Sequence, residues 1–116
     1  MKSIIYEKSF RFSLRIVKLY QYLQKTKREM VMSKQLLRCG TSIGANVAEA
    51  QHAQSRADFC SKLNIALKEA AETEYWLKLL HESGYLSADE FSSIFASCTE
   101  IENILTSIVR TLKSKA

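Results

Sequence analysis

The sequence predicts an all-α protein whose four helices form an up-down-up-down antiparallel bundle. Its 116 residues include no proline and only three glycines, as expected for long helices joined by few turns. Apolar residues recur every three or four positions in four stretches, which is the period of one helix face. The connections between these stretches are short, so consecutive helices are expected to lie antiparallel. We expect residues 1–116 to form one domain with a core of ordinary size.

The first helix is expected from Tyr6 to Lys25. Its main apolar row steps by four, three and four positions through Phe12, Ile16, Leu19 and Leu23. A second apolar row lies beside it, at Phe10, Leu14 and Val17. The apolar face is therefore wide, as in a helix that contacts two neighbours. The polar residues Thr26 to Glu29 follow and predict a tight hairpin.

The second helix is expected from Met30 to Ala53, and it contains two glycines. Gly40 has two interpretations, because it could end one helix or lie inside a continuous one. The apolar register continues through it, at Leu36, Ile43, Val47 and Ala50, which favours a single helix. Gly40 and Gly44 then cost roughly 1 kcal/mol each relative to alanine. With Ala48 they form a row of small residues that lets a neighbouring backbone approach closely, so we expect this helix to be central.

The third and fourth helices have clear end signals. Ser55 is the expected N-cap of the third helix, which runs to about Ser83 and is followed by Gly84. Ser87 and Glu90 form a capping box for the fourth helix, expected from Ala88 to Lys113. The apolar stripe of this last helix steps three and four for three heptads, through Phe91, Ile94, Cys98, Ile101, Leu105, Ile108 and Leu112.

Composition excludes several classes of protein. No apolar run approaches the 18 residues of a membrane span. The first residues, Met1 to Phe12, have no signal-peptide pattern, so we expect a cytoplasmic protein with no membrane partner. The net charge of +5 is unevenly spread: residues 1–38 hold ten basic and two acidic residues, and the remainder is mildly acidic. This asymmetry suits a polyanion, or a complementary face of another protein.

Catalytic and metal-binding motifs are weak. Cys39, Cys60 and Cys98 are widely spaced and fit small reduced core residues better than a zinc or redox site. Glu49 and His52 have the Glu-x-x-His spacing of di-iron bundles, but those sites need a second copy, which the sequence does not contain. No nucleophile motif or phosphate loop is present. We therefore expect no metal, no cofactor and no enzymatic activity.

Glu74 is predicted on the apolar face of the third helix, with Glu72 nearby. A buried carboxylate needs a partner. Arg38 and Asn46 of the second helix are the natural candidates, and we interpret these four residues as a structural polar contact that fixes helix register.

A basic stripe is the candidate functional surface. Arg11, Arg15 and Lys18 step by four and three along one side of the first helix, and Lys25, Lys27 and Arg28 extend them at the hairpin. We interpret these six residues as a polyanion-binding surface. Two other interpretations remain open. The charges could simply be solvated, or they could dock an acidic protein. Tyr75 and Trp76 of the third helix also suit a protein contact.

The residues from Ser33 to Glu49 resemble the second-helix signature of the bacterial four-helix bundle proteins encoded within 23S rRNA intervening sequences. Three further features fit the same family: the helix start at Ser55–Phe59, the pair Glu72 and Glu74, and Gly84–Leu86 before the last helix. The resemblance therefore covers essentially the whole chain.

One position departs from the family pattern, because many members carry Ile-Pro where this chain has Ile43 and Gly44. That difference leaves open whether the helix is kinked there. The family resembles the accessory protein of diversity-generating retroelements, a pentameric barrel that binds nucleic acid and a reverse transcriptase. The resemblance thus implies a homopentamer and not a reaction. RNA or DNA is the polyanion partner that we expect for this chain.

Overall fold

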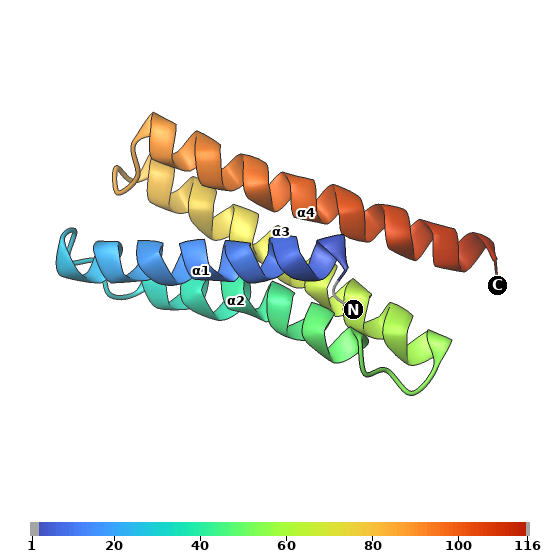
Figure 1. Cartoon of the computed structure of the whole chain (residues 1–116). Helices are drawn as coiled ribbons and strands as arrows, with labels where there is room; N and C mark the ends of the chain where they lie inside the picture. Colours follow the sequence, from blue (N-terminus) through green and yellow to red (C-terminus); the bar gives the residue numbers. More distant parts are fainter. Residues whose placement is uncertain (1–2, 116) are drawn as a thin grey trace.

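The computed structural model describes residues 3–115 and contains four long helices in them (Figure 1). They are α1 (Ile4–Lys25), α2 (Met32–Ala50), α3 (Arg56–Glu82) and α4 (Ala88–Ser114). Each helix packs on the next, and α4 returns to pack on α1, which confirms the antiparallel four-helix bundle. In this arrangement α1 and α3 are diagonal neighbours. The bundle measures 47 × 22 × 21 Å. Within residues 3–115, none of the helices has an apolar stretch that could span a membrane.

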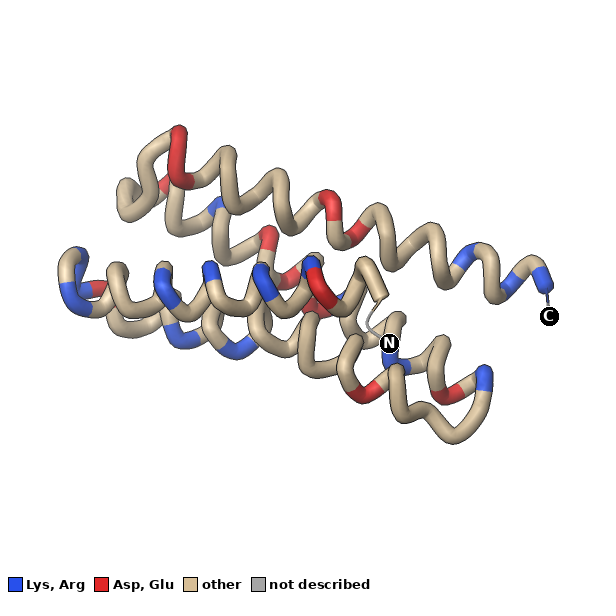
Figure 2. The backbone as a smooth tube through the Cα atoms, in the orientation of Figure 1, with Lys and Arg blue, Asp and Glu red and all other residues tan. Residues whose placement is uncertain are grey.

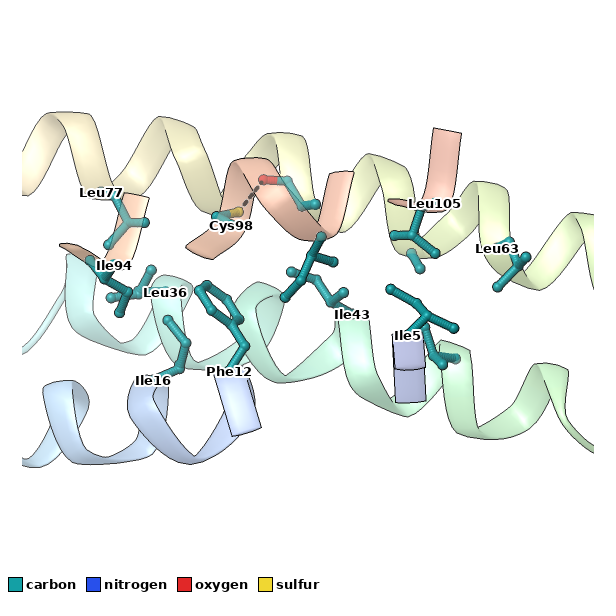
Figure 3. Packing of buried hydrophobic residues seen from close by; sticks show 14 of the residues in the cluster. Ile5, Phe12, Ile16, Leu36, Ile43, Leu63, Leu77, Ile94, Cys98 and Leu105 are labelled. Atoms are coloured by element: carbon teal, nitrogen blue, oxygen red, sulfur yellow. Dashed lines mark hydrogen bonds between the residues drawn. The ribbon is translucent and has the colours of Figure 1, made fainter. Parts of the chain in front are cut away.

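The core is built from the predicted rows of all four helices. Figure 3 shows Phe12, Ile43, Leu77 and Leu105, one from each helix, pointing into the same apolar interior. The buried sulfur of Cys98 donates to the carbonyl oxygen of Ala70 at 3.5 Å. Burial raises the pKa of the Cys98 thiol, so it stays in its neutral form.

The second apolar row of α1 does not join this core. Phe10, Leu14 and Val17 are 53%, 51% and 36% exposed. The row points outward because α2 and α4 flank the buried row of α1 and leave its opposite side uncovered. Helix α1 therefore contacts two neighbours, as predicted, but only its buried row makes these contacts.

Helix α2 runs unbroken through both glycines, as the apolar register predicts. A Cβ atom on Gly40 would lie 2.8 to 3.0 Å from side-chain carbons of Ile16, and one on Gly44 would lie 3.0 Å from the Oγ of Ser13. The backbones of α1 and α2 thus approach more closely than an alanine would allow. The row of small residues has the predicted role.

The connection between α1 and α2 differs from the prediction, because α2 begins at Met32 and not at Met30. The carboxylate of Glu29 accepts the backbone N–H groups of Val31, Met32 and Ser33 at 2.9, 2.9 and 2.6 Å, and so caps the helix from outside. Arg28 has a φ of +57°, the left-handed position that glycine usually takes after a helix. The N–H of Glu29 donates to Leu23 O at 3.0 Å and closes the end of α1.

The remaining helix ends follow local signals. Ser55 caps α3, and the capping box of Ser87 and Glu90 is present. Gly84 has a φ of +90°, as expected of the glycine after α3. Helix α2 ends at Ala50 and not at Ala53, because the next three residues make tighter backbone bonds that each span three positions.

Candidate nucleic-acid interface

The predicted basic stripe lies on α1 and faces the contact with α4. Arg11, Arg15 and Lys18 are all exposed. Lys8 precedes them by one helical step, and its Nζ forms an ion pair with Glu100 of α4 at 3.1 Å. We call Lys8, Arg11, Arg15 and Lys18 the α1 basic row. Sequence reasoning left out Lys8, although its spacing of three from Arg11 continues the stripe.

Arg15 is the member of the α1 basic row that α4 holds in place. Its two terminal nitrogens donate to the hydroxyl oxygens of Ser97 and Ser93, at 2.8 and 2.9 Å. Hydroxyl groups accept these bonds without neutralising the guanidinium charge. The two serines therefore fix a cation at the surface and leave its charge available. Sequence reasoning missed both serines, because their role depends on how α4 is aligned with α1.

Three open hollows follow the α1 basic row: the first lies on α1 alone, and the other two lie in the α1–α4 groove. Their volumes are about 250, 170 and 410 Å³ from the start of α1 onward. The central hollow has three cations of the row in its lining and one carboxylate, Glu100: the complete lining is Lys8, Arg11, Phe12, Arg15, Ser97, Glu100 and Ile101. A string of small hollows suits an extended polyanion better than a compact ligand.

The three hairpin residues continue the basic surface beyond α1. Lys25, Lys27 and Arg28 are all exposed. Lys27 lies near the start of α4, where Glu90 accepts the backbone N–H of Ser87. This hydrogen bond is the main reason that the pKa of Glu90 lies below its usual range, and the charge of Lys27 adds to the effect. The hairpin cations therefore lie at the same end of the bundle as the start of α4, as Figure 2 shows for the basic positions at the turn.

The six predicted residues share one electrostatic property. Within residues 3–115, none of Arg11, Arg15, Lys18, Lys25, Lys27 and Arg28 forms an ion pair within 4.0 Å. Lys8 is the member of the α1 basic row that does have a carboxylate partner, Glu100, and other paired cations lie away from the row, such as Lys62, which pairs with Glu49 at 3.0 Å. The basic surface is therefore not a set of internal salt bridges between α1 and the acidic helices.

The predicted polar contact forms between Arg38 and Glu72, but Asn46 and Glu74 take no part in it. Arg38 forms an ion pair with Glu72 and a second one with Glu69 at 3.6 Å. Trp76 Nε1 also donates to Glu72, at 3.0 Å. Asn46 does not reach Glu74, because its amide bonds to the carbonyl and hydroxyl of Ser42 in its own helix. Pairing Glu74 with Arg38 or Asn46 was wrong.

Glu74 instead faces α4. Its carboxylate accepts the hydroxyl of Thr99 at 3.1 Å, and it shares a hydrogen bond with Glu102. Partial burial and this neighbouring carboxylate raise the pKa of Glu102 to about 8. Glu102 therefore tends to keep its proton near neutral pH, which reduces the repulsion between the two carboxyl groups.

The histidines have separate surroundings. His52 is exposed beyond the end of α2. The Nδ1 of His81 lies 3.0 Å from the carbonyl oxygen of Leu86, and its ring stacks on Phe91 with centroids 4.5 Å apart. Among the described residues, no three His, Cys, Asp or Glu side chains are grouped to hold a metal ion.

Comparison with known proteins identifies the family. The family model for the 23S rRNA-intervening sequence protein matches residues 1–107. No curated protein matches the chain. The chain is also similar to a solved structure of a protein with unknown function from the S23 ribosomal protein family, from Bacteroides thetaiotaomicron VPI-5482. The two are 56% identical with a TM-score of 0.91, over 91% of this chain and 98% of the other. The chain therefore belongs to the 23S rRNA-intervening sequence protein family.

Proposed function

We propose that this chain is a non-catalytic nucleic-acid-binding protein that acts as a closed homo-oligomer, with RNA or DNA bound along the α1–α4 groove. The observation that carries the proposal is the run of exposed cations without carboxylate partners: Arg11, Arg15, Lys18, Lys25, Lys27 and Arg28. A charge that is already paired inside a protein gains little from a phosphate. These six are available for one.

The dimensions of the α1 basic row suit a nucleic-acid backbone. A helix rises 1.5 Å per residue, so the row from Lys8 to Lys18 is about 15 Å long. Phosphates along one strand of a duplex are spaced about 3.4 Å apart along its axis. The row therefore spans several phosphates. Contacts to phosphates carry no sequence information, so we expect binding that depends weakly on sequence and strongly on salt.

A closed oligomer strengthens such contacts. Each copy contributes one α1 basic row, and linked sites bind with avidity even when each is weak. The outward row of Phe10, Leu14 and Val17 supports self-association, since exposed apolar rows on a helix are typical of interfaces. The family resemblance supports five subunits.

An enzymatic role has little support in the arrangement of side chains. The strongest acid–base candidate is the pair of Glu74 and Glu102. Neither residue lines the three hollows beside the α1 basic row, and neither lines a larger hollow on α4 between Ala96 and Ile108.

Fluorescence titration of labelled single- and double-stranded RNA and DNA, at low and at physiological salt, tests the proposal. The wild-type protein should bind at low salt and weaken steeply as salt rises. Charge reversal at Arg11 and Lys18 should abolish binding and leave the oligomer size unchanged, since neither side chain has an ion pair to lose. If the wild-type protein binds no nucleic acid at low salt, the proposal is wrong. The better interpretation is then a scaffold that binds an acidic protein.

A further inference from the structure

The three hollows beside the α1 basic row differ in charge. The first and the central hollow each have more cations than carboxylates in their lining. The third, at the start of α4, has one cation, Arg15, and two carboxylates, Asp89 and Glu90. We call it the Asp89 hollow. A surface that binds phosphates throughout would not place two carboxylates around its largest hollow, so this hollow suits a different part of the ligand.

Both carboxylates of the Asp89 hollow are charged groups that an anion would have to approach. Glu90 accepts the backbone N–H of Ser87 at 2.9 Å, and this bond holds the pKa of Glu90 below its usual range. Asp89 forms no ion pair within 4.0 Å in the described part of the chain. Two negative charges against one positive charge repel a phosphate and attract a hydrogen-bond donor. The hollow therefore suits an uncharged group that carries N–H donors.

The floor of the Asp89 hollow is apolar. Leu86 and Ile94 are each 4% exposed, and the half-buried Leu19 lies beside them in the lining. The volume of about 410 Å³ is within the range of roughly 300–1,000 Å³ that is usual for small organic ligands, and the other two hollows are smaller. Flat nucleic-acid bases stack on apolar side chains of this kind. An apolar floor with a polar rim is thus the surface that a single base requires.

Arg15 connects the Asp89 hollow to the phosphate path, because it lines both this hollow and the central one. Its guanidinium is fixed by Ser97, which lines the central hollow, and by Ser93, which lines the Asp89 hollow. A strand with a phosphate on Arg15 therefore has its attached base beside the Asp89 hollow. The larger hollow on α4 between Ala96 and Ile108 has no cation in its lining and lacks this connection.

We propose that the Asp89 hollow binds an unpaired guanine base of the strand whose phosphates contact the α1 basic row. The inference rests on the proposed function and adds to it a base preference and a preference for single strands. Guanine carries two neighbouring donors, N1–H and the N2 amino group, on one edge, and these match the two oxygens of a carboxylate. In a duplex the same donors pair with cytosine, so only an unpaired guanine can offer them to Asp89.

Asp89 is free for this role because the helix cap does not use it. The start of α4 is capped by Ser87 and Glu90, whose side chains and backbone N–H groups satisfy each other. One oxygen of Glu90 is occupied in that cap, whereas the carboxylate of Asp89 is exposed and lines the hollow. Asp89→Asn should therefore fold as the wild-type protein does, which circular dichroism can check.

Fluorescence anisotropy with short labelled single-stranded RNAs tests the inference at low salt. One RNA contains uridine only, and the second has one central guanosine. The wild-type protein should bind the guanosine RNA about tenfold more tightly, the scale on which one bidentate contact discriminates between bases. Asp89→Asn should bind both RNAs equally. Because the loss of any negative charge strengthens binding to every RNA, the readout is the ratio of the two affinities. The control, Glu82→Gln, removes the same charge from the end of α3 and should keep the wild-type ratio.

Two further RNAs separate hydrogen bonding from stacking without any protein variant. Inosine keeps N1–H but lacks the N2 amino group, and adenosine has neither donor, so both should bind the wild-type protein more weakly than guanosine. Equal wild-type affinity for the uridine and guanosine RNAs, equal affinity for inosine and guanosine, or a preference that survives in Asp89→Asn would each overturn the inference. Binding of the uridine RNA tests the proposed function separately: if it binds without a guanosine preference, only the inference is wrong, and if neither RNA binds, both are wrong.

Discussion

Replacing Glu29 tests the helix cap that the structure reveals between α1 and α2. Glu29 is 6% exposed, and its carboxylate accepts hydrogen bonds from three backbone N–H groups at the start of α2. The N-cap residue itself, Val31, has an apolar side chain that accepts no hydrogen bond from these N–H groups. Glu29→Ala removes the acceptor completely, and Glu29→Gln keeps one acceptor oxygen but removes the charge.

The expected loss follows from which N–H groups water can reach. Val31 is 73% exposed, so water can replace the carboxylate there. Ser33 is fully buried, and its N–H would remain unsatisfied at a cost of about 1–3 kcal/mol. Loss of a cap adds about 1 kcal/mol. We expect Glu29→Ala to lower the free energy of unfolding by about 2–4 kcal/mol, and Glu29→Gln by about half as much.

The effect should depend on pH in a defined direction. Burial by itself would raise the pKa of Glu29, but the N–H groups of Met32, Ser33 and Val31 outweigh it and hold the pKa below its usual value of 4.5. A carboxyl with a lowered pKa stabilises the fold above the unfolded value, and this stability is lost as pH falls through the folded value. The advantage of wild type over Glu29→Gln should therefore be large at pH 7 and small at pH 3.

Urea unfolding followed by circular dichroism at both pH values measures this difference. Glu82→Gln is the control, because Glu82 is an exposed glutamate at the end of α3. A loss below about 0.5 kcal/mol for Glu29→Ala at pH 7, within the range of ordinary surface substitutions, would refute the capping argument.

Three further predictions concern the packing, a carboxyl pair and a strained turn. Gly40→Ala should destabilise the protein by up to about 2 kcal/mol in urea unfolding, because overpacking against Ile16 outweighs a helix-propensity gain of about 1 kcal/mol. In an Ile16→Ala background, the same change should stabilise the protein. Since burial and Glu74 raise the pKa of Glu102 to about 8, the folded state holds a proton that the unfolded state releases above its usual 4.5. Stability should therefore fall as pH rises between these values, and Glu102→Gln should flatten that slope in unfolding curves at pH 5 and pH 8. Arg28→Gly should raise the unfolding midpoint, since a side chain at a φ of +57° costs about 1 kcal/mol, and an unchanged or lower midpoint would contradict the turn geometry.

The parts of the fold that local sequence determines were predictable. The apolar register located all four helices, and the caps at Ser55 and Ser87 act within a few residues of themselves. The cap from Glu29 was not predictable in this way, because it requires Arg28 to adopt a left-handed conformation that its residue type does not favour. The same missing turn explains why α2 starts two residues later than expected.

Contacts between helices were predicted less well, because they depend on how each helix is rotated. Glu74 was expected to face α2, but the setting of α3 turns it toward Thr99 of α4. In the candidate interface, the spacing along α1 was enough to predict that Arg11 and Lys18 lie together on an exposed side of the helix. The serines that hold Arg15 belong to α4, and only the alignment of two distant segments brings them to it.

The salt dependence of nucleic-acid binding shows directly whether the α1 basic row contacts phosphates. Binding of a labelled single-stranded RNA would be measured by fluorescence anisotropy over a salt series, for wild type and for Arg11→Gln with Lys18→Gln. Each lost phosphate contact lowers the magnitude of the slope of log K against log salt by about 0.7 on a single strand, so we expect a decrease of about 1.4 per bound subunit. The control, Arg110→Gln with Lys113→Gln, removes the same charge from the end of α4 and should change the slope little. A wild-type protein that does not bind at low salt, or a control that loses as much slope as the α1 variant, would contradict the account.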